Sequence, residues 1–241
     1  MAKNRPRRGS PLHLTSAFGL FNPSKDLILK HIWIFGPLYG VFIFFSLHSW
    51  MWTPSNPSGD NQWWDNFFVT TPAGPSLTFF GYSVVGFSLL WLLITAVIGT
   101  IAQIMIQAAQ LEAAQGRTPA FEKLWASVKE LGFRMFGLYI VVSLVILVGL
   151  ILLIIPGLFM IKRYFLSPYV MLDKKVGIRE AMDKSAAISK PFSAIWGIVL
   201  VMILYSLIAI IPLIGWLVSF ILLMLYSAAP ALRYQELKKL T

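Results

Sequence analysis

The residues of this sequence best able to do chemistry are Lys162 and Arg163, which are adjacent within an apolar stretch. If that stretch lies in lipid, each charge costs roughly 2.5–3.5 kcal/mol, so the side chains must face a partner, a cavity or the head groups. They either extend to the head groups, form hydrogen bonds across a helix bundle, or bind a substrate, an ion or a lipid phosphate. We expect Lys162 to extend to the head groups and Arg163, with its five donors, to be paired inside the protein.

A stripe of polar residues is the best partner for Arg163 that the sequence offers. Its members recur at steps of three and four residues: Thr100, Gln103, Gln107 and Gln110. On a helix this spacing places them along one face. Polar side chains between membrane helices form hydrogen bonds worth about 0.6–2 kcal/mol each. We interpret the stripe as a set of packing contacts, with a polar path for a solute as the alternative.

The other polar residues form no pattern typical of catalysis or metal binding. The chain has no Cys, and none of its three His has a His or carboxylate three or four residues later. There is no phosphate-binding Gly-Lys-Ser/Thr loop and no Gly-x-Ser-x-Gly elbow. Asp60 and Asp65 are interpreted as solvated loop residues. We therefore predict no catalytic residue, no metal and no cofactor.

The composition indicates which elements must position these residues. The chain of 241 residues is 57% hydrophobic and 12% charged, whereas soluble domains are near 45–50% apolar and about 25% charged. The mean hydropathy of +0.73 likewise indicates a chain that lies mainly in lipid. The sequence predicts an all-α, polytopic membrane helix bundle.

Stretches without Asp, Glu, Lys or Arg locate the predicted spans. A crossing helix needs about 20 residues, and the last such stretch is long enough for a hairpin around Pro212 and Gly215. Residues 157–172 would reach only about 24 Å as a helix, so a re-entrant segment stays open there. The predicted spans are about residues 32–50, 79–106, 135–155, 157–172, 192–211 and 213–232.

The basic residues predict the topology. Apart from Lys162 and Arg163, every Lys and Arg falls within residues 3–30, 117–134, 174–190 or 233–239. Six crossings place all four clusters on one side, and basic loops are typical of the cytoplasmic side. We predict a basic, disordered cytoplasmic tail (residues 1–19) and one six-helix membrane domain (residues 20–241). Both termini would be cytoplasmic, in the plasma membrane of a prokaryote.

Two amphipathic stretches, residues 121–133 and 177–190, are predicted to form helices in the head-group plane. Together with the basic tail they provide candidate contacts to anionic lipids of the inner leaflet. The candidate residues are Arg5, Arg7, Arg8, Lys123, Lys129 and Lys184. Because these charges are tethered beside a membrane, lipid is the expected partner and nucleic acid is not. A protein partner remains open.

Several short motifs resemble a known family. Leu20-Phe-Asn-Pro-Ser24 precedes the first span, and Ile155-Pro-Gly157 is followed by an apolar segment with an embedded Arg163. Gly177-Ile-Arg-Glu-Ala-Met-Asp-Lys-Ser185 and Ala231-Leu-Arg-Tyr234 come later. In this order they resemble the prokaryotic six-span proteins of the YciC-like and glycerophosphodiester phosphodiesterase membrane-domain superfamily. The resemblance covers about residues 20–237, implies the six-span fold, and provides no catalytic residue.

Three function classes follow from these observations. A structural, lipid-associated or partner-organising membrane protein is favoured, because no catalytic constellation is found. A transporter or permease of a small molecule or lipid is the alternative, with a polar site near Arg163, Gln103 and Gln107. A lipid-modifying enzyme is ranked last, because every Asp and Glu lies outside the predicted spans.

Overall fold

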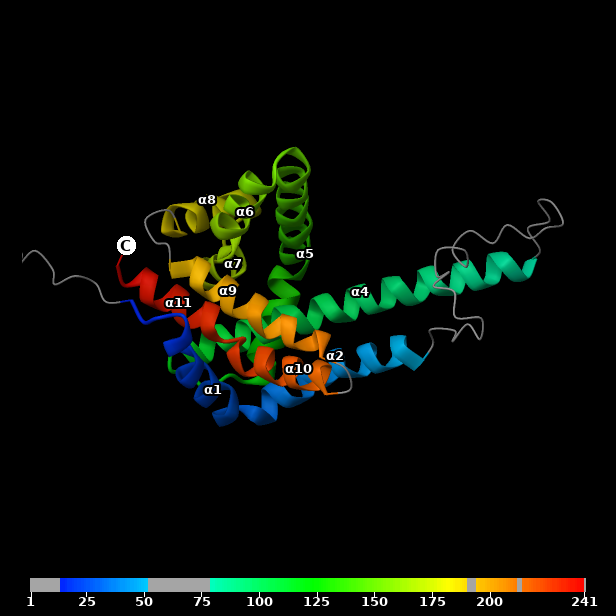
Figure 1. Ribbon diagram of the computed structural model, residues 1–241, viewed down its shortest axis with the longest axis horizontal. Coiled ribbons are helices and arrows are strands. Elements are labelled where there is room, and N and C mark those ends of the chain that lie inside the picture. The colour runs from blue at the N-terminus through cyan, green and yellow to red at the C-terminus, as the bar shows by residue number, and fades with distance from the viewer. Residues whose placement is uncertain (1–13, 52–78, 190–193, 212–213, 241) are drawn as a thin grey trace, which may run out of the picture. The chain divides into compact units, whose positions relative to one another are not determined.

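The computed structural model describes residues 14–51, 79–189, 194–211 and 214–240, and within these ranges all regular structure is helical (Figure 1). The predicted all-α class is confirmed for this part of the chain. Contacts divide the chain into two units, which are described separately. One unit is Gly36–Gln103, and the other is Met1–Phe35 together with Ile104–Thr241.

The described residues of the smaller unit belong to two long helices, α2 (Ile32–Met51) and α4 (Phe79–Ala114). Both begin where the apolar pattern predicts. α4 continues past the predicted end at residue 106, because residues 104–114 contain neither Gly nor Pro. It ends before Gly116, whose φ of +76° is the left-handed conformation that commonly closes helices.

α5 (Phe121–Leu152) is one unbroken helix, so the prediction of a separate interfacial helix at residues 121–133 is wrong. No proline occurs within α5 to end its hydrogen-bond ladder. The apolar face of its first part continues across the predicted border, and four residues of this face are buried: Leu124, Leu131, Met135 and Leu138. Three of these, Leu131, Met135 and Leu138, pack in a core that also contains residues of α7, α8 and α11. The amphipathic pattern at the start of α5 therefore reflects packing against other helices of the same chain.

The segment predicted to cross at residues 157–172 is two helices, α6 (Ile154–Tyr164) and α7 (Ser167–Lys174). Pro168 lies in the first turn of α7, where no intrahelical donor is required. The turn before α6 is at Leu153, whose backbone is extended (φ −161°, ψ 136°), and so lies before the predicted end of the third span at residue 155. α6 alone is too short to cross a hydrocarbon core of about 30 Å.

α6 packs back along α5 through two glycines. A Cβ on Gly157 would lie 2.6 Å from the side chain of Leu150. A Cβ on Gly149 would lie 2.9 Å from the Cα of Gly157. Any larger residue at these positions would force the two helices apart, which is why small residues are typical of close helix contacts in membranes.

α8 (Ile178–Ser189) is confirmed as a separate amphipathic helix with the predicted faces. Ala181, Ser185 and Ile188 are buried, whereas Arg179 and Asp183 are exposed. The buried face packs on α6 and α7. Its position in a head-group plane stays a prediction.

The predicted carboxy-terminal hairpin is present. α9 (Ala194–Leu207), followed by a 3-10 turn (Ile208–Ile210), packs against α10 (Gly215–Tyr226). The second arm ends at Tyr226, short of the predicted residue 232, and α11 (Ala229–Lys238) begins after a two-residue break.

Ser24 fills the break between α10 and α11. Ser24 belongs to α1 (Phe21–Lys30), which packs against both helices. Its Oγ donates to the carbonyl of Leu225 at 2.7 Å and accepts from the N–H of Ala228 at 3.2 Å. A buried hydroxyl thus satisfies backbone groups that the interrupted helix leaves without a partner.

Among the described residues, three helical stretches are long and apolar enough to cross a membrane: Leu93–Ala114, Phe121–Leu152 and Gly215–Lys238. A fourth is counted if α1 and α2, which meet at a bend at His31, form one span. The chain thus has several helices compatible with a multi-pass membrane protein.

Candidate functional site

A charged pocket of about 490 Å³ lies between α6 and α8. Four of its residues come from the last turns of α6, and four come from α8. They are Phe159, Met160, Lys162, Arg163, Asp183, Ala186, Ala187 and Ser189. The pocket thus contains both residues that the sequence singled out first.

A side-chain cap on a helix end brings α6 and α8 together. The hydroxyl of Ser185 donates to the carbonyl of Arg163 at 2.9 Å. The last carbonyls of a helix have no intrahelical partner, so a donor from a neighbouring helix stabilises that end. Small residues at four-residue steps, Ala181, Ser185 and Ser189, allow α8 to approach closely.

The side chain of Arg163 differs from the expectation of internal pairing. It is exposed, and its guanidinium carbon lies 5.7 Å from the centre of the Tyr164 ring. Within the described residues its guanidinium forms neither a hydrogen bond nor an ion pair. Lys162, expected to extend outward, is instead half-buried. The donor required at this helix end is supplied by Ser185, so the guanidinium remains available to the pocket.

The register of α6 on α5 determines which end of the apolar segment holds the two cations. Ile161 and Tyr164 share a small cavity with Tyr139 and Val142 of α5. Tyr139 follows Arg134 by about 7.5 Å of helix rise. Lys162 and Arg163 therefore lie near the charged end of the apolar part of α5, away from the turn at Leu153.

The pocket also contains two polar groups that sequence analysis did not assign to it. Asp183 is exposed, and among the described residues no ion pair joins its carboxylate to Lys162 or Arg163. The Oγ of Ser189 is buried and has no hydrogen-bond partner in the part of the chain that the structure describes. Asp183 and Ser189 are six residues apart, about 240° around a helix, so periodicity on α8 does not place them on one face. Only the pocket beside α6 relates them to Arg163.

Two residues of the polar stripe on α4 form hydrogen bonds with tyrosines of other helices. Gln107 accepts from the hydroxyl of Tyr139 at 2.6 Å, and Gln110 accepts from the hydroxyl of Tyr169 at 2.8 Å. Thr100 and Gln103 belong to the smaller unit, where the hydroxyl of Thr100 donates to the carbonyl of Ala96. These bonds favour the interpretation of the stripe as packing contacts.

Asp173 forms a polar cluster that sequence analysis missed. Its carboxylate accepts from Gln115 at 3.0 Å, Tyr234 at 2.8 Å and Lys238 at 2.7 Å. Burial alone would raise the pKa of Asp173, but the hydrogen bonds from Lys238 and Tyr234 and the charge of Lys238 outweigh burial and hold that pKa below its ordinary value. Its partners lie 58 to 65 residues away, so no local pattern could reveal them.

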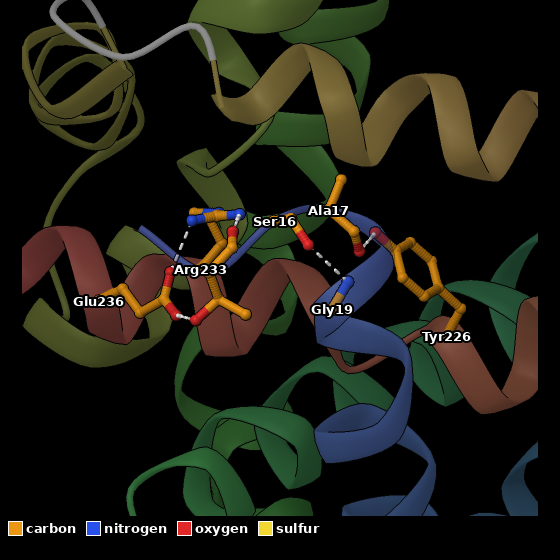
Figure 2. Close-up of polar contacts among 7 residues, drawn as sticks. Ser16, Ala17, Gly19, Tyr226, Arg233 and Glu236 are labelled. Atoms are coloured by element: carbon orange, nitrogen blue, oxygen red, sulfur yellow. Dashed lines mark hydrogen bonds and ion pairs between the residues drawn. The ribbon is translucent and has the colours of Figure 1, made fainter. Parts of the chain in front are cut away.

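Arg233 forms a second missed cluster with the amino-terminal segment (Figure 2). Its side chain is only 1% exposed, and it pairs with Glu236 at 2.6 Å. Its second amino group donates to the carbonyl of Thr15, and the hydroxyl of Thr15 donates to Glu236 at 2.6 Å. Figure 2 also shows the hydroxyl of Tyr226 donating to the carbonyl of Ala17 at 2.8 Å.

The prediction of a disordered tail at residues 1–19 is wrong for residues 14–19. Residues 14–19 pack on α10 and α11 through Arg233 and Tyr226, because a buried guanidinium needs carbonyl and carboxylate acceptors. The basic residues of the tail, Arg5, Arg7 and Arg8, lie outside the described residues. Residues 14–19 therefore belong to the bundle.

The other candidate lipid contacts are in solvent-accessible positions. Lys123 and Lys129 are exposed on α5. Lys184 is half-buried and pairs with Glu180 at 2.5 Å, one turn earlier on α8.

Across the described ranges, no three His, Asp or Glu side chains gather closely enough to hold a metal ion.

Comparison of the chain with protein-family models, with curated proteins and with solved structures finds no match. The resemblance to the six-span superfamily stays a prediction from the motifs.

Proposed function

We propose that the chain is a structural or lipid-associated protein of a prokaryotic plasma membrane, without catalytic activity. In this proposal it crosses the membrane six times, both termini are cytoplasmic, and its basic clusters contact anionic lipids of the inner leaflet.

The observation that carries the proposal is the uncovered apolar surface of α5. Ile151 is 75% exposed and Leu152 is 72% exposed, and Leu144, Leu147 and Val148 are exposed on the same helix. A soluble monomer rarely exposes a continuous apolar surface of this kind. Lipid chains are the partner that covers such a helix at no cost in desolvation.

The polar interior supports a role other than catalysis. The buried or half-buried groups of Asp173, Gln107, Gln110 and Arg233 are each bonded to side chains of the bundle itself. Such bonds stabilise helix packing but leave the groups committed, whereas a catalytic side chain must be accessible to its substrate.

Six crossings with cytoplasmic termini are supported by the charge distribution. The four basic clusters fall on one side only if residues 157–172 return the chain. In that topology α6 and α7 together form one broken crossing that returns the chain beside α5. The turn at Leu153 is then external, and α8 lies at the inner interface.

Membrane extraction and lipid retention test the proposal. The chain is expected to remain in membranes washed with alkaline carbonate, and to retain phospholipid through purification in a mild detergent. Release into the soluble fraction by carbonate, or a detergent-free monomer in solution, would contradict it.

The pocket beside Arg163 also favours a second candidate, a lipid or small-molecule transporter. Liposomes with fluorescent lipids distinguish the two roles, because quenching from outside reports whether lipid moves between leaflets. Our proposal predicts the same rate with and without the protein. An acceleration that Arg163→Gln abolishes would favour the transporter.

A further inference from the structure

We propose that the charged pocket between α6 and α8, with the apolar groove beside it, binds one phospholipid whose head group carries both a phosphate and a primary ammonium. This inference rests on the proposed function, because it requires the pocket to lie at the level of the head groups.

The two signs of charge in the pocket match the two ends of such a head group. Lys162 and Arg163 present cations from α6, and Asp183 presents a carboxylate from α8. Within the described residues these opposite charges are not joined by an ion pair, although they line one cavity. A phosphate between the cations and an ammonium beside Asp183 would satisfy both, and guanidinium is well suited to bind phosphate with two hydrogen bonds.

Ser189 supplies an independent polar group. Its hydroxyl is buried in the wall of the pocket and lacks a partner in the part of the chain that the structure describes. A buried donor without an acceptor is costly, so a bound oxygen at this position would stabilise the fold as well as the ligand. A phosphate ester oxygen is an acceptor of this kind.

An apolar groove adjoins the charged pocket and fits an acyl chain. Met160 lines both cavities. The groove has a volume of about 370 Å³ and is lined only by apolar residues: Leu144, Val145, Val148, Gly149, Leu152, Pro156 and Met160. It lies between α5 and α6 on the way toward the turn at Leu153. A charged cavity beside an apolar one, with Met160 in the wall of both, favours an amphiphile over a soluble anion.

The position of the pocket along α5 agrees with a head group there. The neighbours of Tyr164 include Tyr139, which follows Arg134 by less than two helical turns. The groove extends from this level into the uncharged part of α5. A lipid bound in this orientation would have its phosphate at the charged end and its chain beside the exposed apolar residues Ile151 and Leu152.

Native mass spectrometry of the purified full chain tests the site, with defined phosphatidylethanolamine, phosphatidylcholine and phosphatidylglycerol added in equal amounts. The ethanolamine lipid is expected to bind about tenfold more tightly than the choline lipid, whose quaternary ammonium has no N–H for Asp183. Asp183→Asn should abolish this preference. The double variant Lys162→Gln, Arg163→Gln should weaken all three lipids about tenfold or more. Glu180→Gln and Lys175→Gln, whose side chains are exposed and do not line the pocket, are the matched controls.

Equal binding of the three lipids to the unaltered chain would overturn the head-group assignment, and this result requires no variant to fold. Loss of preference in Glu180→Gln as well as Asp183→Asn would overturn the role of Asp183. Glycerophosphoethanolamine, which has the head group without the chains, should bind at least about tenfold more weakly; equal binding would make this a site for a soluble phosphate ester. None of these outcomes would change whether the chain stays in membranes washed with alkaline carbonate. The lipid site can therefore be refuted without refuting the proposed function.

Discussion

The hydroxyl of Ser185 lies 2.9 Å from the backbone carbonyl of Arg163, and this hydrogen bond joins α8 to the end of α6. It stabilises the wall of the charged pocket and explains why Arg163 does not need to cap its own helix. Ser185 is fully buried, so the bond is protected from water.

Ser185→Ala should lower the free energy of unfolding by about 1–3 kcal/mol, because it removes a buried hydroxyl that donates to the carbonyl of Arg163. Thermal unfolding in detergent measures the effect. Ser127→Ala is the control, since the hydroxyl of Ser127 is bonded to the carbonyl of Lys123 within its own exposed turn. Equal losses from the two substitutions would mean that the contact between α6 and α8 does not stabilise the bundle.

Arg233→Ala should release the amino-terminal segment from α11. The substitution leaves the carbonyl of Thr15 without its donor and Glu236 without its cation, at a cost of about 3–5 kcal/mol for a buried pair. Hydrogen exchange should then become faster at residues 15–20. Lys239→Gln, at an exposed position directly after α11, should leave exchange unchanged. Unaltered protection in Arg233→Ala would refute the anchoring role.

Acid should weaken the Asp173 cluster. The pKa of Asp173 is below its ordinary value in the folded chain, so the carboxylate contributes stability at pH values above about 3.9, and this contribution is lost as the pH falls toward the folded pKa. The melting temperature of the unaltered chain should therefore fall on acidification below about pH 4. In Asp173→Asn the fall should be smaller. Parallel curves for the two proteins would show that the cluster is not the titrating element.

Gly157→Ala should destabilise the contact between α5 and α6 by about 1–3 kcal/mol, because the new Cβ overlaps the side chain of Leu150. Gly99→Ala is the matched substitution, since a Cβ there meets no atom within 4 Å and alanine favours the helix. Circular dichroism during heating measures both. A stabilising effect at both positions would contradict the close packing of α6 on α5.

Residue patterns along the chain were sufficient to predict the helical class, the two faces of α8 and the carboxy-terminal hairpin. These features depend on periodicity and on breaks such as Pro212, which are local. The unbroken course of α5 was not predicted, because an amphipathic face packed on protein has the same spacing as one packed on lipid. Only the burial of Leu124 and Leu131 in the folded chain distinguishes the two cases.

The candidate site was predicted in part. The adjacent cations Lys162 and Arg163 were recognisable because charge is rare in apolar stretches. Their relation to Asp183 and Ser189 depends on how α6 is aligned against α8, which no spacing in the sequence determines. The anchoring of Thr15 by Arg233 joins residues 218 positions apart and is likewise a tertiary property.

The central claim is a multi-pass membrane protein with α8 and both termini on the cytoplasmic side. Because the chain contains no Cys, single cysteines report their side of the membrane without background. Lys239→Cys and Arg179→Cys should react with a membrane-impermeant maleimide only after the cells are permeabilised, whereas Ser58→Cys should react on intact cells. Labelling of Lys239→Cys or Arg179→Cys on intact cells would contradict the account.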